Sequence, residues 1–317
     1  MATAAPGHEH MTIFWIGFNA FVVVMLLLDL FVFHRHSHVI GFKEALRWSA
    51  FWISLAMAFA VFVYFWRGPH DALTFLTGYL IEESLSVDNL FVFLVIFSYF
   101  RVPRENEYKV LFWGIIGALV MRLLFIFAGV ALINRFHWII YVFGVFLIYT
   151  GIKLFRQSET EVHPEHNPLL KLLRRLVPIT KDYHGDKFFI TENGRRLATP
   201  LLAVLVVVES TDVLFAADSI PAILAITTDT FIVYTSNVFA ILGLRSLYFA
   251  LAGLMGVFHY LHYGLSVILI FIGTKMLISA YVKIPIWIAL GVVVGVLAIS
   301  VGVSLINPKK EAEEKAP

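Results

Sequence analysis

The chain has 317 residues, of which 60% are hydrophobic and 15% charged, and its mean hydropathy is +0.84. A soluble globular chain is about 25% charged, so this composition excludes a soluble protein and indicates a membrane protein. The formal net charge of +2 says little about partners, and we expect no nucleic-acid partner. The absence of cysteine excludes disulfides, thiolate metal sites and thiol chemistry.

Apolar runs of about 20 residues, each long enough to cross a bilayer, alternate with polar breaks along the whole chain. The sequence therefore predicts an all-α polytopic membrane protein with about nine transmembrane helices, in a single domain over residues 1–317. The predicted spans lie near residues 11–33, 48–66, 72–98, 109–130, 136–155, 199–224, 229–255, 260–281 and 285–306.

One connection is long, from about residue 156 to residue 198. Its polarity and its proline and glycine content predict an extramembrane loop. We expect the loop to be partly ordered, with the FFIT run at 188–191 pairing as a short strand. A short polar tail begins at about residue 307.

Lysine and arginine are distributed unequally between the two sides of the predicted membrane. Of the 24 basic residues, 18 lie on the side of the long loop, 3 lie on the other side and 3 lie inside spans. Without the 9 in and beside the long loop, the ratio is still 9 to 3. Because positive residues mark the cytoplasmic side, the loop and the C-terminus are predicted to be cytoplasmic and the N-terminus outside.

Two spans carry acidic residues in apolar surroundings. The third contains EESLSVDNLFVF and the sixth contains ESTDVLFAADSIPAI. An ionised group at the bilayer centre costs roughly 2.5 to 3.5 kcal/mol, so such groups persist where a cavity, a partner or an ion compensates them. The pattern predicts cation handling inside the membrane. The acidic residues are Glu82, Glu83 and Asp88 in the third span and Glu209, Asp212 and Asp218 in the sixth.

The two acidic segments resemble one another. Aligning Glu82 with Asp212 also aligns Asp88 with Asp218. The segments are three spans apart, an odd number, so they cross the bilayer in opposite directions. Inverted repeats with a binding site near the midplane are a recurring plan of transporters, and this plan requires that relation. We therefore expect an inverted repeat that relates the two acidic helices.

Helix geometry indicates which of these groups can meet. At about 100° per residue, Glu82, Ser86 and Asn89 share one face of the third span, and Asp88 lies about 120° away. The sixth span repeats this arrangement, with Asp212 and Ser219 on one face, Glu209 beside them and Asp218 about 120° away. One regular helix cannot direct all of these groups at one ion. The pattern predicts either two adjacent subsites or a local break in each helix.

Pro221 provides a cause for a break in the sixth span. Proline lacks an N–H and clashes with the carbonyl four residues earlier, which belongs to Ala217. That carbonyl lies next to Asp218 and is a candidate supporting ligand. No proline supports a break in the third span.

The candidate ligands are carboxylates, an amide, hydroxyls and a carbonyl. These oxygen groups suit hard divalent cations such as Mn²⁺, Mg²⁺ and Ca²⁺, and do not suit Zn²⁺ or copper. Carboxylates also carry protons, so exchange of protons for metal is chemically available. The predicted metal ligands are Glu82, Asp88, Asn89, Glu209, Asp212 and Asp218, with Glu83, Ser86, Ala217 and Ser219 as supporting groups.

Three basic residues lie inside predicted spans: Arg122, Arg245 and Lys275. We interpret them as charge partners and not as substrate ligands. The alternative for the acidic residues is a structural polar network with these three bases. Three bases cannot neutralise six acids, so a cation remains the better explanation.

At these residues the chain resembles a known family. The two acidic segments, followed by SNVFAILGLRSLYF, resemble the bacterial TerC family of integral membrane proteins, most closely its Alx-like manganese exporters. The resemblance runs from about residue 10 to residue 306. It implies a nine-span inner-membrane protein associated with manganese export, and the acidic residues of the family motif fall on Glu82, Asp88, Glu209, Asp212 and Asp218.

The sequence thus predicts an inner-membrane transporter that exports a divalent cation, with Mn²⁺ favoured, by alternating access of inverted halves. No enzymatic activity and no cofactor are expected, and the expected partners are the cation and the lipid bilayer. Two alternatives stay open: a membrane-embedded assembly or insertion factor, and a metal-dependent membrane enzyme. The sequence leaves open the oligomeric state, the selectivity among Mn²⁺, Mg²⁺ and Ca²⁺, and the coupling to protons.

Overall fold

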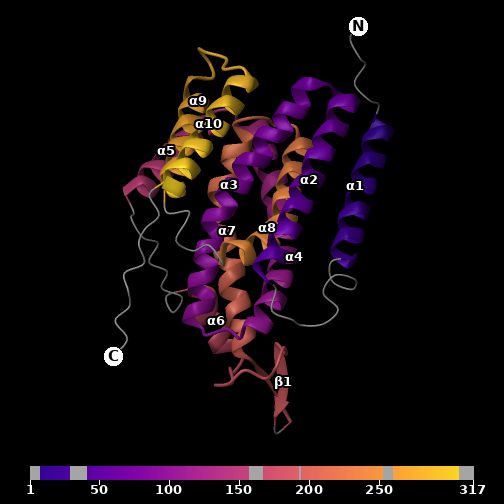
Figure 1. Ribbon diagram of the computed structural model, residues 1–317, viewed down its shortest axis with the longest axis vertical. Helices are drawn as coiled ribbons and strands as arrows, with labels where there is room; N and C mark the ends of the chain where they lie inside the picture. Colours follow the sequence, from indigo (N-terminus) through magenta and orange to yellow (C-terminus); the bar gives the residue numbers. More distant parts are fainter. Residues whose placement is uncertain (1–7, 29–40, 157–166, 193, 253–259, 307–317) are drawn as a thin grey trace. The chain divides into compact units, whose positions relative to one another are not determined.

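The computed structural model describes residues 8–28, 41–156, 167–192, 194–252 and 260–306. In these residues the protein is almost entirely helical. The chain divides into two compact units, Met1–Val39 and Ile40–Pro317. The first unit contains helix α1 (His8–Leu28). The second unit contains all the remaining described elements, from α2 to α10 (Figure 1).

The second unit is a group of long helices with one short helix and one hairpin. Its elements in chain order are α2 (Phe42–Arg67), α3 (Pro69–Tyr99), α4 (Arg104–Arg135), α5 (Ile139–Arg156), α6 (Pro168–Leu176), β1 (Phe189–Glu192), β2 (Arg195–Ala198), α7 (Pro200–Leu224), α8 (Thr230–Ala252), α9 (Leu261–Ile278) and α10 (Ile286–Ile306).

Seven of the described helices are long and apolar enough to cross a membrane, namely α2, α4, α5, α7, α8, α9 and α10. Helix α3 is longer than most of them, with 31 residues, but it carries four acidic residues. These features make the chain a multi-pass membrane protein. Each of the nine predicted spans overlaps one described helix. Parts of the first and seventh predicted spans lie outside the described residues.

Some helices are longer than their predicted spans. Helix α4 begins at Arg104 and has 32 residues, whereas the predicted span is 109–130. Hydropathy marks the part of a helix that lies in hydrocarbon, and a helix can continue into water beyond that part. The polar first turns of α4 are such an extension.

Helix α8 lies at the centre of the second unit. It packs against α2, α3 and α4, and 89% of its most apolar stretch is buried in the protein. Helix α10 packs against α3 and α9, yet only 17% of its most apolar stretch is buried. A helix that is apolar on all sides is either buried or faces lipid, and these two helices illustrate both cases.

Helices α5 and α9 cross closely because glycines lie at the contact. A Cβ atom added to Gly151 would come within 2.9 Å of the carbonyl oxygen of Ser266. A Cβ atom added to Gly273 would come within 2.6 Å of the carbonyl oxygen of Gly144. The two helix backbones therefore touch at two places, with a glycine from a different helix at each.

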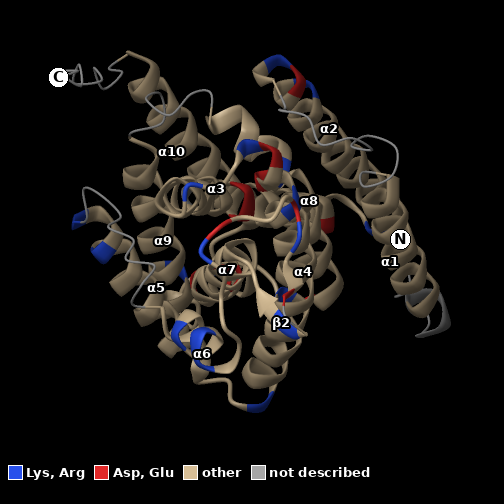
Figure 2. Cartoon of the chain, turned by 90° about the horizontal axis from the view of Figure 1, so that it is seen from below, with Lys and Arg blue, Asp and Glu red and all other residues tan. Residues whose placement is uncertain are grey.

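The described part of the segment between α5 and α7 contains a short helix and a hairpin, which confirms the prediction of ordered structure there. Helix α6 and the β1–β2 hairpin lie at the end of the unit where α7 begins (Figure 1). The predicted strand at 188–191 is confirmed by β1, which pairs antiparallel with β2, Phe189 opposite Ala198. Figure 2 views the unit from this end and shows basic residues on α6 and β2.

The loop before β1 is attached to the corner between α3 and α4. The hydroxyl of Tyr183 donates to the carbonyl oxygen of Phe100 at 2.9 Å, and burial raises the pKa of Tyr183 to about 12. The side chain of Asn106 donates to the carbonyl oxygen of Gly185 at 2.9 Å. These bonds fix the hairpin to the end of the helices.

An ion pair joins the same two segments. Lys109 of α4 donates to the Asp186 carboxylate at 2.9 Å, and this hydrogen bond lowers the pKa of Asp186. The Asp186 side chain is 68% exposed, so the pair contributes little to stability. The lowered pKa keeps the carboxylate ionised, and the pair intact, throughout the neutral range.

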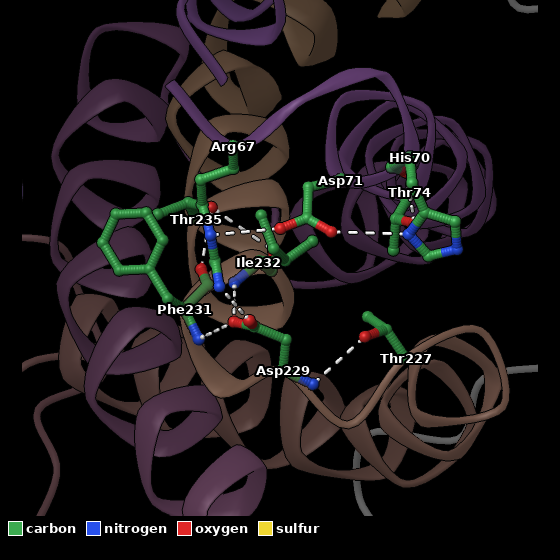
Figure 3. Close-up of polar contacts among 9 residues, drawn as sticks. All are labelled: Arg67, His70, Asp71, Thr74, Thr227, Asp229, Phe231, Ile232 and Thr235. Atoms are coloured by element: carbon green, nitrogen blue, oxygen red, sulfur yellow. Dashed lines mark hydrogen bonds and ion pairs between the residues drawn. The ribbon is translucent and has the colours of Figure 1, made fainter. Parts of the chain in front are cut away.

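A second ion-pair cluster lies at the opposite ends of the helices, where α2 meets α3 and α8 begins (Figure 3). The guanidinium of Arg67 bonds to Asp71 at 3.0 Å and to Asp229 at 2.6 Å. Asp229 also caps α8, because its carboxylate accepts from the backbone N–H groups of Phe231 and Ile232. Arg67 therefore connects the α2–α3 corner to the start of α8.

Candidate functional site

Arg122 of α4 lies at the centre of a buried polar cluster. Its side chain is 3% exposed and forms ion pairs with Glu82 of α3 and with Asp212 of α7. The distance from Nη2 of Arg122 to Oδ1 of Asp212 is 3.2 Å. One cation therefore holds one acidic residue from each of the two acidic helices.

An amide and a hydroxyl complete this cluster. Asn237 of α8 donates to Oε2 of Glu82 at 2.9 Å and accepts from Arg122 at 3.4 Å. Arg122 also donates to Ser219 of α7 at 3.4 Å. Four helices, α3, α4, α7 and α8, thus meet at one network. We call these residues, Glu82, Arg122, Asp212, Ser219 and Asn237, the Arg122 cluster.

The Arg122 cluster retains unused oxygen atoms. Among the described residues, Oδ2 of Asp212 and Oγ of the neighbouring Ser86 are buried without a hydrogen-bond partner. Two carboxylates face one guanidinium, so when both are ionised the cluster carries one net negative charge. Its chemistry can hold a proton or attract a further cation.

Asp218 lies in a different place from Asp212. Its carboxylate accepts a hydrogen bond from the hydroxyl of Thr150 of α5 at 3.1 Å. Both residues line a cavity of about 210 Å³ between α3, α5, α7 and α9. Asn89 of α3 and Lys153 of α5 also line the cavity. Residues that carry a carboxylate, an amide, a hydroxyl and an ammonium group therefore border one space, which we call the Asp218 cavity.

Glu209 lies against the backbone of α4. Its carboxylate occupies the space that a side chain on Gly117 would need, and Glu209 is half-buried. It also interacts electrostatically with Asp212, one turn later in α7. Glu209 is thus a neighbour of the Arg122 cluster and does not line the Asp218 cavity.

Glu83 points in another direction. It is half-buried, and its carboxylate interacts with the hydroxyl of Tyr79, one turn earlier in α3. Its Oε1 atom lies 4.0 Å from where a Cβ on Gly243 of α8 would be. Glu83 therefore faces α8, away from the Asp218 cavity.

Of the two predicted alternatives, the local break in each helix is wrong. Helix α3 is continuous from Pro69 to Tyr99, and α7 is continuous from Pro200 to Leu224 through Pro221. Pro221 lies in the last turn of α7, so only one backbone hydrogen bond near the helix end is lost. The candidate ligands of α7 lie on different faces of this continuous helix. Asp212 and Ser219 are on a buried face, and Ala217 is on an exposed face.

The remaining predicted residues occupy separate positions. Asp88 is in α3, but its side chain is outside what the structure describes. The guanidinium of Arg245 lies 4.3 Å from the centre of the Tyr108 ring. The ammonium group of Lys275 donates to the carbonyl oxygen of Ala225, at the end of α7, at 3.4 Å. Among the contacts of the described residues, the ion pairs of Arg122 join the two acidic helices.

The described side chains form no group of three or more acidic or histidine residues that could hold a metal ion. The ligand set predicted from the sequence is instead divided among the Arg122 cluster, the Asp218 cavity, Glu209 and Glu83. The Asp88 side chain lies outside this described set.

Sequence reasoning missed Asn237, Thr150 and Lys153. Asn237 and Thr150 carried no signal, because single polar residues are common in membrane helices. Lys153 carried one: the run Ile148 to Leu154 reads I-Y-T-G-I-K-L, and the run Ile270 to Met276 in α9 reads I-F-I-G-T-K-M. Comparing α5 with α9 would have matched Lys153 to Lys275, a residue already named as a charge partner.

Comparison with known proteins gives the family. The sequence profile described as "Integral membrane protein TerC family" matches residues 67–312. This range covers α3 to α10, including both acidic helices. The chain belongs to the TerC family.

Several relatives of this TerC protein match nearly its whole length. An uncharacterized membrane protein of Myxococcus xanthus is 58% identical over 295 residues, which is 93% of this chain and 92% of the relative. A protein of Escherichia coli K12, provisionally named membrane-bound redox modulator Alx, is 48% identical over 296 residues, 90% of this chain and 92% of the relative. A membrane protein of Rickettsia bellii is 41% identical over 293 residues, 92% of this chain and 97% of the relative.

No solved structure matches this TerC protein.

Proposed function

We propose that this TerC-family protein exports a divalent metal cation across the inner membrane, with Mn²⁺ as the first candidate. The observation that carries the proposal is the Asp218 cavity, where a carboxylate, the Asn89 amide and the Thr150 hydroxyl border one space between membrane helices. Such oxygen groups suit hard cations. Asp88 precedes Asn89 in α3 and is a further candidate ligand.

The Asp218 cavity is a better entry site for a cation than the Arg122 cluster. In that cluster a guanidinium already lies between Glu82 and Asp212. A divalent cation would have to displace it, at the cost of leaving a buried positive charge without its partners. We therefore assign the Arg122 cluster the role of joining the two acidic helices, and the Asp218 cavity the role of binding.

An inverted repeat of three helices is part of the proposal, with α3, α4 and α5 corresponding to α7, α8 and α9. Beyond the two acidic segments, two more sequence pairs support it. Arg122 and Arg245 each begin an R-x-L-aromatic run, in α4 and α8. Lys153 and Lys275 each follow a glycine by two residues, in α5 and α9.

The contacts between α5 and α9 support the same correspondence. Gly151 packs on the backbone of Ser266 and Ile270, and Gly273 packs on the backbone of Gly144 and Ile148. Exchanging each residue for its counterpart in the repeat converts the first set of contacts into the second. A two-fold relation between antiparallel halves would produce this exchange, and transporters with alternating access use such a relation.

Nine spans and a cytoplasmic C-terminus complete the proposed topology. The basic residues of α6 and β2 are on the side that the distribution of charge assigns to the cytoplasm. A reporter inserted near Glu165 and a reporter after Pro317 should therefore both report the cytoplasm. Opposite labelling of the two sites would refute this arrangement.

Thiol chemistry plays no part in the proposed function. The E. coli relative is named a redox modulator, but the present chain has no cysteine and cannot exchange disulfides through its own side chains. We propose a transporter and not an enzyme, with protons as the candidate counter-ion because carboxylates bind both protons and metal.

The test is transport by the purified full chain in proteoliposomes loaded separately with Mn²⁺, Mg²⁺, Ca²⁺ or Zn²⁺. The proposal predicts saturable movement of a hard cation, fastest for Mn²⁺, and little movement of Zn²⁺. A pH-sensitive dye in the lumen tests the exchange of protons. Vesicles with the protein that are no more permeable to any of the four ions than empty vesicles would contradict the proposal.

A further inference from the structure

We propose that the ammonium group of Lys153 is a tethered counter-cation of Asp218, which an arriving metal ion has to displace and which speeds the release of that ion. The inference rests on the transport function proposed above. It assigns Lys153 a positioning role at the binding site and not the role of a ligand.

Helix α5 contributes two polar residues to the Asp218 cavity. Thr150 and Lys153 both belong to α5 and both line the Asp218 cavity. Residues three apart lie on the same face of a helix, so Thr150 and Lys153 reach the cavity from the same face of α5. Thr150 donates to Asp218 at 3.1 Å, and the charge of Lys153 acts on the same carboxylate.

The lysine side chain suits such a role. It carries a compact charge on a flexible four-carbon stem, so it can move toward a carboxylate or away from it. Lys153 is exposed and is in the last turn of α5, which leaves room for its ammonium group to withdraw. An arginine with a planar guanidinium, such as Arg122 between two acidic residues, is held far more firmly.

Lys275, the counterpart of Lys153 in the proposed repeat, makes a different contact. Lys275 of α9 donates to the carbonyl oxygen of Ala225 at 3.4 Å, where α7 ends. A cation at the C-terminus of a helix is stabilised by the helix dipole. One lysine thus borders an open cavity while its counterpart is bonded to the end of a helix. Exchange of these two states between the lysines would accompany the change of access from one side to the other.

The electrostatic consequence is measurable. A unit positive charge within several ångströms of a bound divalent cation repels that cation. The repulsion energy remains large even when the effective dielectric constant is high. Removing the charge of Lys153 should therefore tighten Mn²⁺ binding about tenfold. Release of the ion should slow by a similar factor, because most differences in affinity between related complexes lie in the dissociation rate.

The experiment compares Lys153→Met, Lys153→Gln and Lys153→Arg with the wild-type chain, purified whole in detergent. Mn²⁺ affinity is measured by titration calorimetry and Mn²⁺ release by stopped flow. Met and Gln should each tighten binding and slow release about tenfold, whereas Arg, which keeps the positive charge, should not tighten binding. Arg156→Gln is the matched control, because it removes a charge from the same last turn of α5 at a residue that does not line the cavity.

Three results would overturn the inference. Wild-type affinity and release in both Lys153→Met and Lys153→Gln would show that the ammonium group does not compete with the metal. An equal effect in Arg156→Gln would show a general effect of charge at the helix end. In either of these two cases the proposed transport function stands. Absence of Mn²⁺ binding by the wild-type chain would remove the transport proposal and the inference together.

Discussion

Arg122 and Asp212 form a buried ion pair between α4 and α7, with 3.2 Å between Nη2 and Oδ1. The same guanidinium holds Glu82 of α3. Charged groups so deeply buried are stable only with their partners, because desolvation of an unpaired charge costs several kcal/mol. Arg122 therefore stabilises the contact between the two acidic helices.

Arg122→Gln should destabilise the protein by about 3 to 5 kcal/mol, because it leaves Glu82 and Asp212 buried without a cation. The measurement is the unfolding temperature of the purified protein in detergent. Neutralising the partners as well, with Glu82→Gln and Asp212→Asn, should recover part of the loss. An unfolding temperature equal to that of the wild type in the single variant would show that the cluster contributes nothing to stability.

Two glycines of α4 provide a matched pair of substitutions. A methyl group on Gly117 would overlap the Glu209 carboxylate, whereas one on Gly114 would meet only Val208, at 3.4 Å. Gly117→Ala should therefore displace Glu209 and lower both stability and transport, while Gly114→Ala should be close to neutral. We would compare unfolding temperature and transport rate in the two variants. Equal behaviour would mean that the position of Glu209 is unimportant.

The sequence was sufficient for the helices but not for the pairing of their polar residues. Composition and polar breaks located the seven described helices that are long and apolar enough to cross a membrane, because a helix in lipid must satisfy its own backbone and carry an apolar surface. The strand at 188–191 was also predictable from its β-branched and aromatic residues. Pairing across helices, as between Arg122 and Glu82, depends on rotations that no single helix encodes.

The predicted ligands fall at separate places in the structure because the sequence of one helix does not encode how it is rotated against its neighbours. Helix geometry placed Asp218 about 120° from the face that carries Asp212, which is compatible with two locations. It could not say that α5 would face Asp218 or that α4 would insert Arg122 between the acidic residues. The predicted break at Pro221 was wrong because a proline in the last turn removes too few hydrogen bonds to interrupt a helix.

The crossing of α5 and α9 gives a test of the proposed repeat. Gly151→Ala and Gly273→Ala each force a methyl group against the backbone of the other helix, so each should destabilise by about 1 to 3 kcal/mol. The two losses should be similar if the halves are related by symmetry. Gly291→Ala in α10 is the control, since a Cβ there meets no atom within 4 Å. Loss in one glycine variant but not in the other would argue against a symmetric crossing.

The most direct test of the central claim is Mn²⁺ transport in proteoliposomes by Asp218→Asn. Asparagine keeps the volume of the side chain and an oxygen that can accept from Thr150, so the substitution removes little besides the charge. Glu105→Gln, at an exposed position in the first turn of α4, is the control. We predict that Asp218→Asn, and likewise Asp88→Asn, abolishes Mn²⁺ transport while expression and helical content are unchanged, and that Glu105→Gln transports normally. Wild-type transport by Asp218→Asn would contradict the assignment of the Asp218 cavity as the cation site.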